Sequence, residues 1–222
     1  MEQPTKIEFY LSPSCPWAWR TALWIRQVAE QVPLEIDWKL FSLAIVNRGH
    51  DYSPDSHSFG YQAEILLTAA RHFGGNDAVE SLYMALGDAL HGRREERNDA
   101  LLTNALTAAN LPVSLLAESR SDKSYEEALV ASHEKAVNEL GAFGVPTIRF
   151  PDSDIAFFGP VVDPVPTGAE AVELWDHFKW SLTKPYLYET KRNRNHKAGP
   201  LGLNDVNESV APVRAPGQAI TA

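Results

Sequence analysis

The sequence predicts an α/β protein with a large all-helical insertion, and three observations predict that class. A strand pattern, a helix pattern and a second strand pattern follow one another within residues 6–40. Residues 53–140 then show helix patterns alone. Strand patterns return at residues 147–158 and precede a last helix. Because about ninety residues are too many for a loop, the middle block is expected to form helices of its own.

The N-terminal unit is a strand, a helix and a second strand. Residues 6–11 form an apolar, β-favouring run, which Pro13 ends. Helical spacing follows, carried by Trp17, Thr21, Trp24 and Val28. Pro33 stops this helix, and residues 34–40 alternate with a period of two, which predicts a strand with one buried face. The short spacing favours a parallel pair of strands joined by a right-handed crossover.

Helix boundaries divide the middle block into five segments. They lie at residues 59–73, 76–91, 98–109, 112–119 and 124–140. Gly74-Gly75 ends the first segment, and Gly141 ends the last as a C-terminal cap. Asn76 or Asp77 can cap the second.

The C-terminal part begins with residues 147–150 and 155–158, which are typical of an antiparallel hairpin. After Thr167 an amphipathic helix carries an apolar stripe of Val172, Trp175, Phe178 and Leu182. The basic stretch 191–197 and the small and polar residues after it predict an extended or flexible, solvated tail. The predicted organisation is a discontinuous sheet domain, an inserted helical subdomain and a tail, at residues 1–52 with 122–190, 53–121 and 191–222.

Composition excludes several classes of function. The net charge of −9 argues against nucleic acid or an anionic membrane as a partner. The chain has no apolar run of membrane-spanning length, and residues 1–5 lack the features of a secretory signal, so we expect a cytoplasmic protein. The seven histidines are scattered, there is one cysteine, and no Gly-x-Gly-x-x-Gly motif occurs. The sequence therefore predicts no metal site and no tightly bound nicotinamide or flavin.

Cys15 stands between Pro13 and Pro16 at the predicted strand-to-helix corner. Pro16 suits the first helical turn, which leaves Cys15 at the cap. There its sulfur would face unpaired backbone N–H groups and the positive end of the helix dipole. The sequence thus predicts a reactive thiol with a pKa below about 8.5. The alternative is a buried cysteine that acts as a small hydrophobe.

Two motifs and the order of elements resemble a known family. Cys15-Pro16-Trp17-Ala18 resembles the Cys-x-x-Cys redox motif with its second cysteine replaced. Gly144-Val145-Pro146-Thr147 resembles the loop that carries a cis-proline opposite that cysteine. The order of strands and helices is similar to that of DsbA-like proteins, a thioredoxin fold with a helical insertion. The stretches that resemble the mycothiol-dependent nitroreductase branch are residues 12–19, 42–47, 82–87 and 157–161.

This resemblance implies a thiol-dependent oxidoreductase and a role for several residues. Cys15 would be the nucleophile, and Pro146 would present the Val145 carbonyl to a bound thiol or substrate. The other residues implied around the thiol or substrate are Pro16, Trp17, Asn47, Tyr61 and His91.

Several of these residues also have a simpler interpretation. Trp17 shares a helix face with Trp24 and can equally belong to the core. Arg48 and His50, which follow Asn47, are more often plain polar loop residues. His91 is expected at an exposed helix end, where an imidazole interacts favourably with the dipole.

Ala18 occupies the position of the family's second, resolving cysteine, so a cycle with two cysteines of this chain is impossible. Turnover then needs an external thiol, and the resemblance implies mycothiol or glutathione as co-substrate, with no tightly bound cofactor. The expected substrates are mixed disulfides, on proteins or small molecules, and small electrophilic or nitro compounds. A homodimer is compatible with the sequence.

Two other functions fit the same pattern. Kappa-class glutathione transferases and the related isomerase share the inserted thioredoxin fold, place a serine near the position of Cys15 and hold the thiol without bonding to it. Alternatively, Ala18 marks a redox-inactive binding module, in which Cys15 would be a slow, ordinary thiol.

Overall fold

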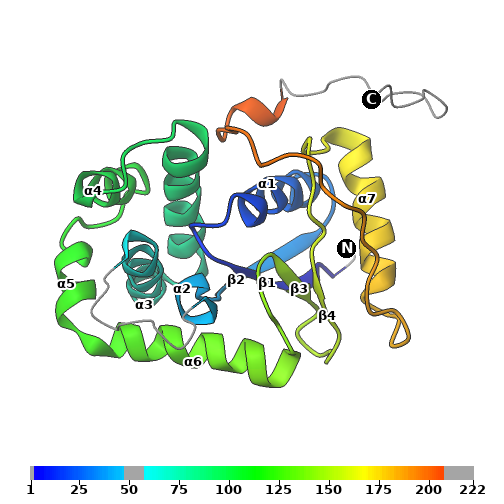
Figure 1. Ribbon diagram of the computed structural model, residues 1–222, viewed down its shortest axis with the longest axis horizontal. Coiled ribbons are helices and arrows are strands. Elements are labelled where there is room, and N and C mark those ends of the chain that lie inside the picture. Colours follow the sequence, from blue (N-terminus) through cyan, green and yellow to red (C-terminus); the bar gives the residue numbers. More distant parts are fainter. Residues whose placement is uncertain (1–2, 48–57, 208–222) are drawn as a thin grey trace.

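The computed structural model describes residues 3–47 and 58–207, and in them a four-stranded mixed sheet forms the centre (Figure 1). The strands are β1 (Thr5–Leu11), β2 (Leu34–Leu40), β3 (Thr147–Arg149) and β4 (Ala156–Phe158), in the order β2-β1-β3-β4. β1 and β2 are parallel, with Thr5 opposite Leu34. β3 is antiparallel to both β1 and β4. The predicted parallel pair and the predicted hairpin are therefore confirmed.

Helices cover both sides of this sheet. In the described residues they are α1 (Pro16–Ala29), α2 (Leu43–Val46), α3 (Phe59–Gly87), α4 (Asp99–Ala108), α5 (Leu115–Ser121), α6 (Lys123–Leu140) and α7 (Gly168–Ser181). α1 and α7 lie together on one side of the sheet, and α6 runs along the other (Figure 1). A π-helical turn (Asp88–Gly92) follows α3, and a 3₁₀ turn (Asp205–Asn207) lies near the end of the described chain. The predicted α/β class with a helical insertion is confirmed.

The first two predicted helices of the middle block are joined in α3, with a kink at the predicted break. Gly74 and Gly75 leave helical geometry there, and Gly75 has a φ of 66°, which only glycine adopts readily. Asn76 does not cap the second half. Its side-chain amide donates to the Ile36 carbonyl at 2.8 Å and accepts from the Trp38 N–H at 2.9 Å. It thereby satisfies backbone groups of β2, an edge strand of the sheet.

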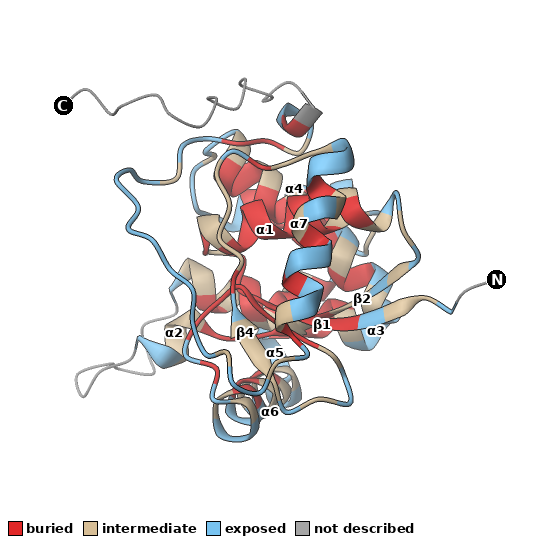
Figure 2. Ribbon diagram, turned by 90° about the vertical axis from the view of Figure 1, so that its right-hand side faces the viewer, coloured by how far each residue is buried: buried red, intermediate tan, exposed pale blue. Residues whose placement is uncertain are grey.

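One hydrophobic core joins the sheet to the helical block. Its largest fully buried side chains include Trp19, Trp24 and Trp38, and the same cluster contains Leu102 of α4. Figure 2 shows buried residues concentrated in the strands and in α1. A second, smaller cluster surrounds Cys15 and includes Ala18, Phe41, Ala136 and Val145. Residues of the predicted sheet domain and of the predicted inserted subdomain thus share one core.

The chain beyond α7 differs from the predicted solvated tail, and we call residues 191–206 the C-terminal strap. Residues 191–197 are exposed, but Leu201 and Val206 are buried against the protein. The Leu201 N–H donates to the His91 carbonyl, and the Leu201 carbonyl accepts from Trp19 Nε1, both at 2.8 Å. The polar composition of this segment does not indicate its docking, because only two apolar side chains and a few backbone hydrogen bonds hold the strap. Among the described helices, none has the length and apolar character of a membrane span.

Candidate active site

Cys15 caps the N-terminus of α1, as its place before Pro16 predicts. Its backbone is extended, with φ −90° and ψ 110°, and Pro16 occupies the first turn. The Ala18 N–H donates to Cys15 Sγ at 3.3 Å. The Cys15 N–H donates to the Ser12 carbonyl at 3.1 Å, which closes the turn between β1 and α1. The sulfur therefore lies at the positive end of the helix.

The second side of the site is the loop before β3. The Val145-Pro146 peptide bond is cis, as the resemblance implies. Cys15 Sγ lies 3.5 Å from the Val145 carbonyl oxygen and can donate its proton to it. Thr147 Oγ1 donates to the Gly144 carbonyl at 2.8 Å and holds the loop on its other side. The fold thus brings together a thiol and a carbonyl that are 130 residues apart in the sequence.

The prediction of a lowered thiol pKa is wrong. Only 8% of Cys15 is exposed, and this burial raises the pKa of its thiol above the ordinary value. The N–H groups of Ala18 and Trp17 lower the pKa, as does the charge of Arg194, but they do not outweigh the loss of hydration. The sequence locates the helix N-terminus but does not show how many side chains surround the sulfur. In the resting protein, the sulfur is predominantly a protonated thiol at neutral pH.

His91 is buried, which makes the prediction of an exposed helix end wrong. Its ring packs beside Trp19, and Nε2 lies 2.8 Å from the Pro13 carbonyl oxygen. Burial lowers the pKa of His91 to about 4, so the ring is neutral at pH 7 and Nε2–H donates to Pro13. Because Pro13 precedes Cys15 by two residues, His91 holds the turn that carries the thiol.

Sequence patterns give no indication of the partners of Glu64, a buried carboxylate on α3. It is 1% exposed and accepts hydrogen bonds from Ser12 Oγ at 2.7 Å, from Ser42 Oγ at 2.5 Å and from the Leu43 N–H at 3.1 Å. These contacts tie the turn before Cys15 to the start of α2. An acidic residue within an apolar helical run was the only available signal.

Tyr61 lies in the first turn of α3, near the Cys15 turn. It is 2% exposed, and its hydroxyl donates to Glu126 Oε1 of α6 at 2.7 Å. The preceding Gly60 allows α3 to approach closely, because a Cβ there would lie 2.6 Å from Ser14 Oγ. Tyr61 therefore links two helices beside the site and is too buried to present a free face to solvent.

Trp17 and Asn47 have more exposed positions. Trp17 is half-buried in the cluster around Cys15, and the Arg194 guanidinium carbon lies 4.7 Å from its ring centroid. Asn47 is exposed at the end of α2. Arg48 and His50 lie outside the described residues. The structure therefore groups Cys15, Pro16, Trp17, Val145 and Pro146 directly, and connects His91 through the Cys15 turn.

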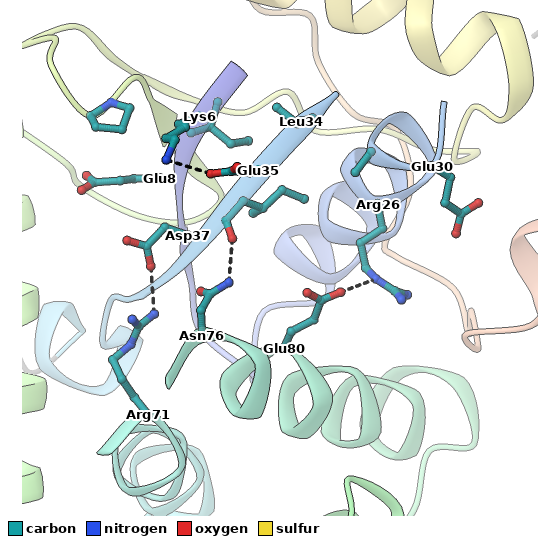
Figure 3. A pocket seen from close by; sticks show the side chains of 14 residues that line it. Lys6, Glu8, Arg26, Glu30, Leu34, Glu35, Asp37, Arg71, Asn76 and Glu80 are labelled. Atoms are coloured by element: carbon teal, nitrogen blue, oxygen red, sulfur yellow. Dashed lines mark hydrogen bonds and ion pairs between the residues drawn. The ribbon is translucent and has the colours of Figure 1, made fainter. Parts of the chain in front are cut away.

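A cavity of about 670 Å³ lies away from this thiol, between the start of the parallel strands and the end of α1 (Figure 3). Its charged groups bind one another: Arg71 pairs with Asp37 at 3.1 Å, and Arg26 pairs with Glu80 at 2.9 Å. None of its lining residues belongs to the predicted site. Within the described ranges, no cluster of potential ligands could hold a metal ion.

The sequence of this chain is similar to a family model and to a curated protein. The family model described as "Rv2466c-like: Mycothiol-dependent nitroreductase Rv2466c" matches residues 14–192. A Mycobacterium tuberculosis protein, "Uncharacterized protein Rv2286c", is 29% identical over 196 residues, which cover 86% of this chain and 83% of that protein.

Two solved structures show the same fold at low sequence identity. A thioredoxin-like oxidoreductase from Silicibacter pomeroyi has 17% identity and a TM-score of 0.53, with 81% of this chain and 87% of that chain covered. The cytosolic disulfide reductase DsbM from Pseudomonas aeruginosa, solved with GSH, has 12% identity and a TM-score of 0.52, with 78% and 99% covered.

Proposed function

The chain belongs to the Rv2466c-like family, described as that of the mycothiol-dependent nitroreductase Rv2466c, and is thus a thiol-dependent oxidoreductase; on this premise we propose that it is a monothiol enzyme. Cys15 is its nucleophile, and a low-molecular-weight thiol from solution completes each turnover. The observation that carries the proposal is the 3.5 Å approach of Cys15 Sγ to the Val145 carbonyl beside a cis-proline, in a chain without a second cysteine.

The reaction proceeds in two exchanges. After losing its proton to solvent, the Cys15 thiolate attacks a mixed disulfide R–S–S–R′, forms Cys15–S–S–R′ and releases R–S⁻, which takes up a proton. A second molecule, R′–SH, attacks the R′ sulfur of that adduct as its thiolate. This step restores the Cys15 thiolate and yields R′–S–S–R′. In sum, R–S–S–R′ and R′–SH give R–SH and R′–S–S–R′.

The residues around the sulfur act on its protonation and orientation. The N–H groups of Ala18 and Trp17 stabilise the thiolate, whereas the Val145 carbonyl accepts the proton of the resting thiol. Ala18 leaves no sulfur that could displace the adduct from within. A resting thiol with a raised pKa therefore needs the incoming substrate or an added charge to become reactive.

Mycothiol is the co-substrate that we propose, because the family description names it. Glutathione is the alternative co-substrate, and the DsbM structure with GSH supports the binding of a tripeptide thiol by a protein of this fold. We place the reaction in the cytoplasm, where a reduced thiol pool is available and where a protein with one cysteine needs no disulfide.

A nitro compound is the second candidate substrate, and the family description favours it. Reducing R–NO₂ to R–NO consumes two electrons and two protons. Cys15 and one mycothiol supply them by forming one disulfide, with water as the other product. A second mycothiol then reopens that disulfide. The half-buried indole of Trp17, next to Cys15, is suited to stack on a flat aromatic ring.

Intact-mass measurement of the full chain with oxidised mycothiol tests the proposal. We expect one mycothiol adduct per chain, which reduced mycothiol removes. Cys15→Ser abolishes the adduct, whereas Ser14→Ala, a change at the neighbouring residue, leaves it in place.

Other outcomes assign a different function. If no adduct forms and transferase activity toward an electrophile survives Cys15→Ser, the thiol is held without a covalent bond, as in kappa-class transferases. If neither activity nor adduct is found, the protein is a binding module.

A further inference from the structure

The C-terminal strap lies across the helix that carries Cys15. Arg20 Nη2 of α1 donates to the Gly199 carbonyl at 3.1 Å, and Trp19 Nε1 of the same helix donates to the Leu201 carbonyl at 2.8 Å. His196 Nε2 lies 2.7 Å from Asp163 Oδ2. The family model ends at residue 192, so most of the strap lies beyond the matched residues.

These anchors place Arg194 over the site. Its guanidinium lies on the Trp17 ring, 4.7 Å from the ring centroid, and Trp17 packs in the cluster that surrounds Cys15. Asp163, the nearby carboxylate, is engaged by Arg20 at 2.7 Å and by His196. Within the described part of the chain, Arg194 forms no ion pair of its own. Arg194 is therefore a cation beside the first turn of α1 that has no carboxylate partner among residues 3–47 and 58–207.

We propose that Arg194 is a positioning residue for Cys15: the docked strap sets its guanidinium at the first turn of α1, where its positive charge stabilises the anionic sulfur of the reacting state. The inference rests on the proposed function, since it assumes that Cys15 reacts as a thiolate. It makes the reactivity of the thiol depend on the docking of a segment nearly two hundred residues away in the sequence.

Other titratable groups surround Cys15, and their charges also act on the pKa of its thiol. The titratable groups around Cys15 are Tyr10 of β1, Glu64 and Tyr83 of α3, His91 of the π-helical turn, His133 of α6, and His196 of the strap. His91 is neutral at pH 7, because burial lowers its pKa to about 4. Burial raises the pKa of Tyr83. The charge of Arg194 acts in the opposite direction to burial on the pKa of Cys15.

The test is the pH dependence of iodoacetamide labelling at Cys15 in the full chain. Arg194→Gln keeps the length and polarity of the side chain but removes its charge. We expect its labelling profile to move to higher pH by about half a unit, which lowers the rate at pH 7 about threefold. Arg194→Lys restores the charge and should label like the wild type. Arg192→Gln, an equal change of charge at an exposed residue of the strap, should leave the profile unchanged.

A second variant tests whether the effect of the Arg194 charge depends on the docking of the C-terminal strap. Leu201 is 6% exposed, so Leu201→Asn, which buries a polar group without adding a charge, should release the strap without altering Arg194. We expect it to shift the labelling profile as Arg194→Gln does, and to add nothing in an Arg194→Gln background. Circular dichroism confirms that each variant is folded.

The inference is overturned if Arg194→Gln labels like the wild type, or if Arg192→Gln shifts the profile equally, which would indicate net charge alone. Additive shifts in the double variant would also overturn it. Because iodoacetamide needs no mycothiol, these outcomes are independent of the adduct experiment. The proposed function fails if no adduct forms, whereas this inference fails if the profile does not move.

Discussion

Cys15 is held between two groups that favour opposite protonation states. The Ala18 N–H, at 3.3 Å, stabilises the thiolate, and the Val145 carbonyl, at 3.5 Å, accepts the proton of the thiol. Burial adds to the second effect and raises the thiol pKa. In the resting protein the balance of these effects therefore favours the protonated thiol.

His91 gives a prediction at the scale of a single residue. Burial lowers its pKa from 6.5 to about 4, so the folded protein binds fewer protons at this site than the unfolded chain does between these values. The contribution of neutral His91 to stability is therefore fully present above pH 6.5 and is lost as the pH falls toward 4. Between pH 7 and pH 5 the loss amounts to about 2 kcal/mol.

Urea unfolding of the wild type and of His91→Gln at pH 7 and pH 5 measures how much the protonation of His91 changes the free energy of unfolding. Glutamine can still donate to the Pro13 carbonyl but does not titrate, so the variant should lose less stability between pH 7 and pH 5. Equal losses in the two proteins would show that other groups cause the acid sensitivity.

At the scale of elements, α1 and α3 approach each other through a glycine. A Cβ on Gly87, at the end of α3, would overlap the ring of Trp19 on α1. Trp19 is 1% exposed and its Nε1 is bonded to Leu201, so the ring has no room to move away. The contact sets the distance between α1, which Cys15 caps, and the helical block.

Gly87→Ala should therefore destabilise the protein, although alanine is the better helix former. Overpacking costs about 1–3 kcal/mol and exceeds the gain in helix propensity of about 1 kcal/mol. Chemical denaturation measures the change, and the cost should shrink in a Trp19→Phe background, where the smaller ring leaves space. A Gly87→Ala protein more stable than the wild type would contradict the close approach.

On the scale of the whole molecule, the shared core predicts that the sheet and the helical block unfold together. Leu102 of α4 is fully buried in the same cluster as the strands. Leu102→Ala should lower the stability of the entire protein by about 2–5 kcal/mol. All six tryptophans lie outside residues 53–121, and two of them, Trp19 and Trp38, pack on Tyr83 of α3, so their fluorescence senses the contact between the sheet part and the helical block.

Tryptophan fluorescence and far-ultraviolet circular dichroism of Leu102→Ala provide the measurement. Both signals should shift to lower denaturant by the same amount, because one cooperative unit unfolds. Ser81→Ala, a change at an exposed residue of α3, serves as the control. Two separate steps in the circular dichroism signal would show that the insertion unfolds as a separate domain.

The sequence by itself determined the order of the strands and helices, the corner at Cys15 and the lack of a resolving sulfur at Ala18. These features depend on local patterns, on proline and glycine geometry and on residue identity. Only the tertiary structure decided the raised pKa of Cys15, the burial of His91 and the docking of the strap that carries Arg194. The physical reason is that hydration and charge at one atom depend on side chains that folding brings from distant parts of the chain, and no local pattern records them.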